Sequence, residues 1–136
     1  MAKEKIGIVV SKFNSEITSK MSRIAQKRAK ELKIKIAEIA EVPGAFEIPL
    51  AAKKLLVKKH IGGVVTLGAI IKGDTDHDEV IAHSIAKSLI DLSLLYHKPV
   101  TLGVLGPNIT WEQAEKRIRE YSERAVETVA KILRKR

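Results

Sequence analysis

The sequence has 136 residues, of which 45% are hydrophobic and 30% are charged, and its net charge is +9. This length suits a single domain with its own core, so we expect residues 1–136 to form one domain. The absence of cysteine excludes disulfides, thiol catalysis and cysteine-bound metals. No apolar run is long enough to span a bilayer and no signal peptide is apparent, so we expect a cytoplasmic protein without membrane contacts.

The basic excess is concentrated in two stretches, residues 20–35 and 116–136. A basic surface suits anionic partners such as phosphorylated metabolites, although two solvated helix faces explain it equally simply. The chain has only one Trp, two Tyr and two Phe, and it contains no nucleic-acid recognition motif. We therefore expect no nucleic-acid partner.

The first half of the chain predicts two strands, each followed by a helix. Residues 6–10 form a continuously apolar run that is typical of a buried strand. Residues 15–32 place apolar side chains at helical spacing, with Ser15 as the expected N-cap. A second strand over residues 34–42 ends at Pro43-Gly44, and a helix follows over residues 45–59.

The second half repeats this alternation. We expect strands over residues 63–71 and 100–105 and helices over residues 78–96 and 111–133. Thr110 and Gln113 fit a capping box at the start of the last helix. Apolar strands that alternate with helices predict an α/β fold: a four-stranded parallel sheet covered on both faces, hence a three-layer α/β/α sandwich. Its two open edges favour a homo-oligomer.

Three familiar motifs fail on individual residues. Gly68 and Gly73 have the spacing of a phosphate loop, but Asp74 stands where the lysine is needed. The segment that begins at Asp74 also lacks the glycine and the last glutamate of a calcium loop. His77 and His83 lie six residues apart and so on different faces of a helix, and we expect no metal site.

Two aromatic side chains at strand ends are candidates for ligand binding. His77 follows a strand and a glycine turn, where open α/β sheets bind ligands, and imidazoles gain or lose protons near neutral pH. A surface or capping histidine is the alternative. Phe13 follows the first strand, and its ring either stacks on a planar heterocycle or caps the core.

Other polar groups also have two interpretations, one in ligand binding and one in the structure. Gly44 permits close approach of the backbone to a ligand, and peptide groups 45–47 offer free N–H donors at a helix start. Glu47 either accepts hydrogen bonds from a ligand or serves as a carboxylate in the first turn of a helix. Arg117 and Arg124 share one helix face, where they suit phosphate recognition or ion pairs with Glu120 or Glu127.

Four segments together resemble the 6,7-dimethyl-8-ribityllumazine synthase family, in its archaeal type. They are Phe13-Asn14, residues 42–49 (Val-Pro-Gly-Ala-Phe-Glu-Ile-Pro), residues 68–73 (Gly-Ala-Ile-Ile-Lys-Gly) with Asp76-His77, and residues 112–114 (Glu-Gln-Ala) with Arg117. They occur in the family's order, with similar spacing, over nearly the whole chain. No single motif is decisive, and the combination is what makes the resemblance specific.

The resemblance implies a flavodoxin-like fold and a transferase of riboflavin biosynthesis. The reaction condenses 5-amino-6-(D-ribitylamino)uracil with 3,4-dihydroxy-2-butanone 4-phosphate, releases phosphate and water, and needs no cofactor or metal. It also implies a homopentamer, or a multiple of pentamers, with active sites between neighbouring subunits. The alternatives are an archaeal riboflavin synthase and a non-enzymatic flavin- or nucleic-acid-binding module, and Phe13-Asn14 and residues 44–47 favour the lumazine synthase.

The resemblance also assigns roles by position. Within one subunit it implies that His77 transfers protons and that substrate is bound by Phe13, Ala45, Phe46, Glu47, Ala69, Ile70, Ile71, Asp74 and Thr75. Phe13 stacks on the pyrimidine ring, and Asp74 and Thr75 meet the phosphate-bearing substrate. From the adjacent subunit, the implied residues are Leu102, Arg117 and Arg124, with Arg117 bound to phosphate. Two features depart from the family: acid at Asp74 and Asp76, and Leu102 in place of an aromatic residue.

Overall fold

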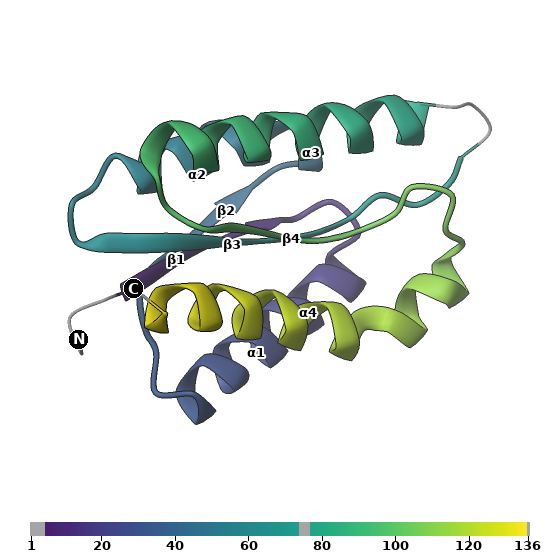
Figure 1. Ribbon diagram of the computed structural model, residues 1–136. Helices are drawn as coiled ribbons and strands as arrows, with labels where there is room; N and C mark the ends of the chain where they lie inside the picture. Colours follow the sequence, from purple (N-terminus) through teal and green to yellow (C-terminus); the bar gives the residue numbers. More distant parts are fainter. Residues whose placement is uncertain (1–4, 74–76, 136) are drawn as a thin grey trace.

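The computed structural model describes residues 5–73 and 77–135 (Figure 1). Its elements in chain order are β1 (Lys5–Ser11), α1 (Ser15–Glu31), β2 (Lys35–Val42), the 3₁₀ turn η1 (Ala45–Glu47), α2 (Ile48–Leu56), β3 (Ile61–Ala69), α3 (His77–Tyr96), β4 (Val100–Leu105) and α4 (Trp111–Arg134).

The four strands form one parallel sheet in the order β2-β1-β3-β4. Helices α2 and α3 cover one face of the sheet, and α1 and α4 cover the other (Figure 1). This arrangement confirms the expected three-layer α/β/α sandwich. Strands β2 and β4 are the edges, so the carboxyl ends of the central strands β1 and β3 lie side by side.

The core consists of one apolar layer on each face of the sheet. Ile8 and the other even-numbered apolar residues of β1 pack with α1 and α4, where Met21 is fully buried. Val9 points to the opposite face and packs with Leu55 of α2 and Ile85 of α3. A strand buried on both faces has to be apolar at successive positions, which explains the continuous apolar run in β1.

The second helix differs from its predicted bounds of residues 45–59. Residues 45–47 form the turn η1 and α2 begins at Ile48, with Pro49 in its first turn, where the missing N–H costs nothing. Helix α2 ends at Leu56, and the ammonium group of Lys98 donates hydrogen bonds to the carbonyl oxygens of Leu56 (2.7 Å) and Lys58 (3.0 Å). The carbonyl oxygens at the end of α2 thus accept hydrogen bonds from a lysine that is distant in the sequence.

Of the two predicted helix caps, the one at Thr110 is confirmed and the one at Ser15 is wrong. Thr110 Oγ1 accepts from the N–H of Gln113 at 3.2 Å, and Gln113 Oε1 accepts from the N–H of Thr110 at 2.9 Å, so the capping box is confirmed. The prediction that Ser15 caps α1 is wrong. The N-cap is Asn14, in the left-handed region at φ 65°; its side chain makes no cap bond, and its amide group donates to the carbonyl oxygen of Ala69 instead.

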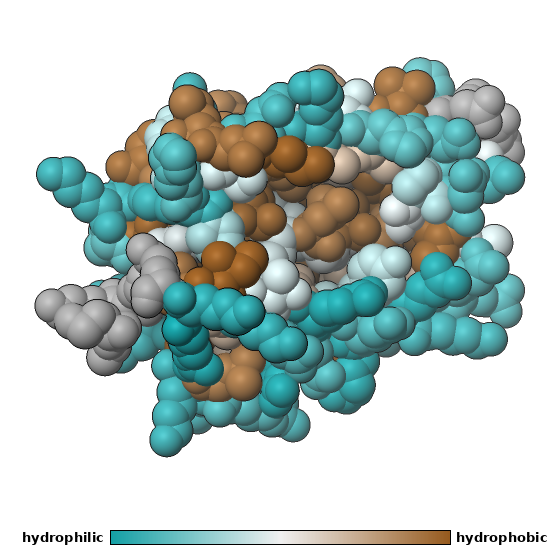
Figure 2. All heavy atoms as spheres, in the orientation of Figure 1, coloured by the Kyte–Doolittle hydropathy of each residue, from teal (hydrophilic) through white to brown (hydrophobic). Residues whose placement is uncertain are grey.

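Exposed apolar side chains gather on one side of the molecule. Figure 2 shows apolar atoms along α3 and over the strand edge between α3 and α4. The large exposed apolar residues in these elements are Val80, Ile90, Leu94 and Leu95 of α3, Leu102 of β4 and Ile132 of α4. A contiguous apolar surface of this kind is typical of an interface rather than of a freely solvated face.

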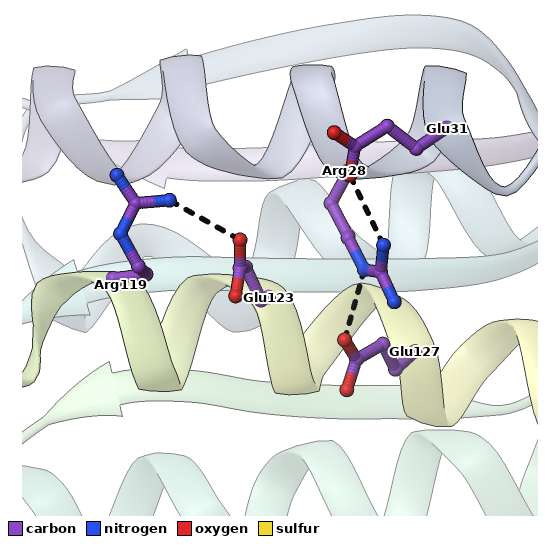
Figure 3. Close-up of polar contacts among 5 residues, drawn as sticks. All are labelled: Arg28, Glu31, Arg119, Glu123 and Glu127. Carbon is purple, nitrogen blue, oxygen red and sulfur yellow. Dashed lines mark hydrogen bonds and ion pairs between the residues drawn. The ribbon is translucent and has the colours of Figure 1, made fainter.

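Ion pairs connect the two helices on the opposite side of the sheet (Figure 3). Arg28 of α1 donates to Glu31 of the same helix at 3.0 Å and to Glu127 of α4 at 2.8 Å. These bonds, to Glu31 first and then to Glu127, raise the pKa of Arg28 above its ordinary value. Arg119 pairs with Glu123 within α4 at 3.3 Å. One of the basic residues, Arg28, thus links α1 to α4 through an ion pair.

Candidate active site

A cleft of about 340 Å³ opens at the carboxyl ends of β1 and β3. This is the edge at which parallel α/β sheets bind small molecules. The described residues that line it come from the loops after β1, β2 and β3 and from the first turns of α3: Phe13, Asn14, Gly44, Ala45, Phe46, Ala69, Ile70, Ile71, Gly73, His77, Asp78 and Ile81.

Backbone bonds bring the first two of these loops together. The N–H of Lys12 donates to the carbonyl oxygen of Val42 at 2.8 Å, and that of Phe13 donates to Pro43 at 3.0 Å. The parallel pairing of β1 with β2 thus continues past the strand ends. As a result, Phe13 lies on the same cleft as Phe46, which follows β2.

Both phenylalanine rings are exposed to solvent. Phe13 is 70% exposed and Phe46 is 71% exposed. The core-capping alternative for Phe13 is therefore wrong, because a capping ring would be covered by its neighbours. Two exposed rings beside an apolar floor suit a flat, uncharged heterocycle.

The loop after β2 is shaped by Glu47. Its Oε1 accepts a hydrogen bond from the N–H of Gly44 at 2.8 Å and so closes the turn η1. A side chain at position 44 would approach this oxygen to 3.2 Å, which explains the glycine. Glu47 is exposed but is not among the residues that line the cleft, so the structure shows its capping role, and contact with a ligand stays a prediction.

His77 begins α3 and lies exposed on the cleft. The last residue of β3 and the two residues after it form the floor: Ala69 and Ile70 are buried and Ile71 is partly buried. Ile70 is held by a 2.7 Å bond from its N–H to the carbonyl oxygen of Leu105 in β4. The cleft thus combines an apolar floor, two aromatic rings and one imidazole.

The residues expected from an adjacent subunit lie elsewhere on the same chain. Leu102 and Arg124 line a second hollow of about 330 Å³ between β4 and α4. Arg124 pairs with Glu120 at 3.6 Å and lies over the Tyr121 ring at 5.1 Å, so the ion-pair alternative applies to it. Arg117 is exposed on α4, and no ion pair of its side chain is found within the described ranges.

Asp74, Thr75 and Asp76 lie outside the described residues, so their expected contacts with the phosphate-bearing substrate stay predictions.

Sequence reasoning missed several residues of the cleft. The sequence carries no separate signal for Asn14 beyond its place next to Phe13, and none for Ile81. Asp78 falls in the segment that fails as a calcium loop, yet it is buried and lines the cleft. A carboxylate next to a candidate catalytic histidine was the available signal for Asp78.

Residues 5–73 and 77–135 contain neither a candidate metal centre nor a candidate membrane span. No group of three or more His, Cys, Asp or Glu side chains there could hold a metal ion. No helix in the same ranges is long and apolar enough to cross a membrane.

Fold and cleft together define an α/β sandwich protein with a small-molecule site at the carboxyl edge of its parallel sheet. Comparison with known proteins makes this more specific, because the model of the 6,7-dimethyl-8-ribityllumazine synthase family matches residues 3–136. The chain therefore belongs to the 6,7-dimethyl-8-ribityllumazine synthase family.

Several relatives with this name align over almost the whole chain. The chain is 53% identical to 6,7-dimethyl-8-ribityllumazine synthase of Metallosphaera sedula over 131 residues, which cover 96% of this chain and 87% of the relative. It is 48% identical to the enzyme of Saccharolobus solfataricus over 131 residues, with 96% and 85% covered. The enzyme of Sulfolobus acidocaldarius is also 48% identical, over 134 residues, with 98% and 85% covered.

Proposed function

We propose that the cleft at the carboxyl ends of β1 and β3 is where this protein forms 6,7-dimethyl-8-ribityllumazine. Family membership over residues 3–136 makes the protein a transferase of riboflavin biosynthesis. Its substrates are 5-amino-6-(D-ribitylamino)uracil and 3,4-dihydroxy-2-butanone 4-phosphate, and its products include inorganic phosphate and water. The observation that carries the site assignment is that Phe13, Phe46 and His77 converge on one apolar cleft.

The pyrimidine substrate fits the aromatic half of this cleft. We assign ring stacking to Phe13, because its exposed face is free of core contacts. Ala69, Ile70 and Ile71 provide the apolar surface beneath the ring. Ala45, Phe46 and Glu47 hold the ribityl chain, whose hydroxyls suit the carboxylate and the backbone groups of this loop.

Proton transfer is assigned to His77. The reaction forms an imine from an amine and a carbonyl and then eliminates phosphate, and both steps move protons to and from the substrates. An imidazole accepts and donates protons near neutral pH, and His77 is exposed on the cleft. Orientation of the two substrates beside this group supplies a further part of the rate, on the order of several kcal/mol.

The phosphate group of the second substrate needs a cation that the described part of this cleft lacks. We infer that Arg117 of a neighbouring subunit supplies it, with Leu102 and Arg124 from the same neighbour. The lack of an ion pair for Arg117 within residues 5–73 and 77–135 supports this role, since a guanidinium group without a carboxylate partner is free to bind phosphate.

A homo-oligomer follows from this division of the site. The apolar surface on α3, β4 and α4 and the open edge of β4 support such an assembly (Figure 2). A cleft on one subunit that receives Arg117 from the next is a heterologous contact, and contacts of this type close into rings. We propose pentamers or multiples of pentamers, located in the cytoplasm.

The decisive experiment mixes the purified protein with both substrates and follows lumazine fluorescence. We expect fluorescence to rise with time only when both substrates are present, with release of one phosphate for each lumazine formed. If the protein instead consumes added lumazine and forms riboflavin, it is a riboflavin synthase and the proposal is wrong.

A further inference from the structure

A buried carboxylate lies directly beside the proposed catalytic histidine. Asp78 follows His77 in the first turn of α3, lines the same cleft and is only 6% exposed. Burial of a carboxylate is costly unless hydrogen bonds replace its water, so such a group is retained where its bonds matter. Its position in the first helical turn offsets part of this cost, because the N-terminus of a helix favours negative charge.

The two oxygens of Asp78 have different surroundings. Oδ2 accepts a hydrogen bond from the backbone N–H of Asn108 at 2.9 Å. Oδ1 is buried and has no hydrogen-bond partner in the described parts of the chain. Within the described residues, the hydrogen bond to this carboxylate thus comes from a backbone donor in the loop between β4 and α4.

That loop is bonded to both sides of the segment that leads into α3. The carbonyl oxygen of Ile109 accepts from the N–H of Lys72 at 2.9 Å, before the segment. Asn108 bonds to Asp78 after it, and the Asn108 side chain adds a 3.3 Å bond to Glu79. Asn108 has a φ of 59°, a conformation that asparagine tolerates well, and this aims its N–H at α3.

We propose that Asp78 is a positioning residue for His77: its bond to Asn108 fixes the first turn of α3 against the loop that leads into α4. This inference rests on the proposed function, since it gives His77 the proton-transfer role. Without the bond, the first turn of α3 is linked to the loop by the longer, exposed bond from the Asn108 side chain to Glu79, and it frays. The imidazole then spends less time in the geometry that the reaction needs, and displacements near 1 Å are enough to slow catalysis.

The test is a double-mutant cycle on purified enzyme with both substrates. Asp78→Ala should lower kcat about ten- to a hundredfold with little change in the KM of the pyrimidine, because Phe13 and the cleft floor are unaffected. Asp78→Asn keeps an oxygen that accepts from Asn108 and should recover most of kcat. In a His77→Ala background, Asp78→Ala should have no further effect on kcat, since both residues act through one imidazole.

Controls separate this proposal from general loss of structure and from failure of the proposed function. Asp91→Ala removes an exposed carboxylate of the same helix, which pairs with Lys87, and should leave kcat unchanged. If Asp78→Ala does not fold, Asp78→Ser replaces it, because the serine hydroxyl is too short to reach Asn108.

Two outcomes would overturn the positioning role. One is an unchanged kcat in Asp78→Ala; the other is multiplicative losses in Asp78→Ala and His77→Ala, which would mean that the two residues act independently. A His77→Ala enzyme as fast as the wild type would instead remove the catalytic assignment of His77.

Discussion

The side-chain amide of Asn14 donates a hydrogen bond to the carbonyl oxygen of Ala69 at 3.0 Å, between residues 55 positions apart. This bond joins the carboxyl end of β1 to that of β3, on the floor of the cleft. Asn14 also occupies the left-handed conformation that begins α1, so one residue turns the chain and ties the two central strands together. The position of Phe13, directly before it, is therefore fixed by a contact made far along the chain.

Asn14→Gly isolates the contribution of this hydrogen bond. Glycine adopts φ 65° without strain, so the substitution removes the side-chain bond and leaves the turn intact. We expect the free energy of unfolding to fall by about 0.5–1.5 kcal/mol, measured by chemical denaturation, and pyrimidine binding to weaken. Asn14→Ala should lose more, because alanine is strained at this φ. Equal losses in the two variants would mean that the turn tolerates alanine.

Phe13→Ala should weaken binding of the pyrimidine substrate without affecting stability. The ring is 70% exposed, so its removal leaves no cavity in the core. Loss of stacking should raise the dissociation constant about three- to tenfold, measured by fluorescence titration or calorimetry. Phe13→Tyr keeps the flat face and serves as the control. A lower melting temperature with unchanged binding would give Phe13 a structural role instead.

His77→Ala should reduce turnover while pyrimidine affinity is retained. General acid–base catalysis contributes about 10²–10⁴-fold, so kcat should fall by an amount in this range. The wild-type rate should also change with pH, because the reaction needs a group that both accepts and donates protons, and the variant should lose this dependence. His83→Ala, on the outer side of the same helix, is the matched control and should behave as wild type. The same pH profile in both enzymes would exclude His77 from proton transfer.

The sequence predicted those parts of the fold and site that are encoded locally. Apolar runs and helical spacing are properties of neighbouring residues, and they gave the order of the strands and helices and the capping box at Thr110. The errors occurred at helix ends that contact residues far away in the sequence. Asn14, which bonds to Ala69, occupies the N-cap position of α1 instead of Ser15, and Lys98 bonds to the carbonyl oxygen at the end of α2.

The same distinction applies to the site. Phe13, Phe46 and His77 follow strand ends, which a parallel sheet brings to one edge, so their proximity follows from the fold class. The bond between Asp78 and Asn108 depends on a loop 30 residues away and left no local pattern. Arg117 has no ion pair within residues 5–73 and 77–135, and its role in phosphate binding stays a prediction from helix spacing and from the resemblance to the family.

Arg117→Ala should impair use of the phosphorylated substrate much more than binding of the pyrimidine. The change removes a charged contact to phosphate, and such hydrogen bonds contribute about 1.5–3 kcal/mol, so the KM for the butanone phosphate should rise at least about tenfold. Arg119→Ala is a matched control two positions away, because Arg119 pairs with Glu123 within α4. Equal losses for the two substrates would count against a specific phosphate contact.

Mixed oligomers test whether two subunits build each site. When the butanone phosphate is kept well below its KM, His77→Ala and Arg117→Ala are each expected to have low activity, but through different halves of the composite site. The two variants are unfolded, mixed in equal amounts and refolded together. Each site takes residue 77 from one subunit and residue 117 from the next, so about one site in four contains both His77 and Arg117. Activity should therefore recover to about a quarter of the wild-type value. Each variant refolded alone is the control, and an inactive mixture that still forms normal oligomers would place both residues in the same subunit's site.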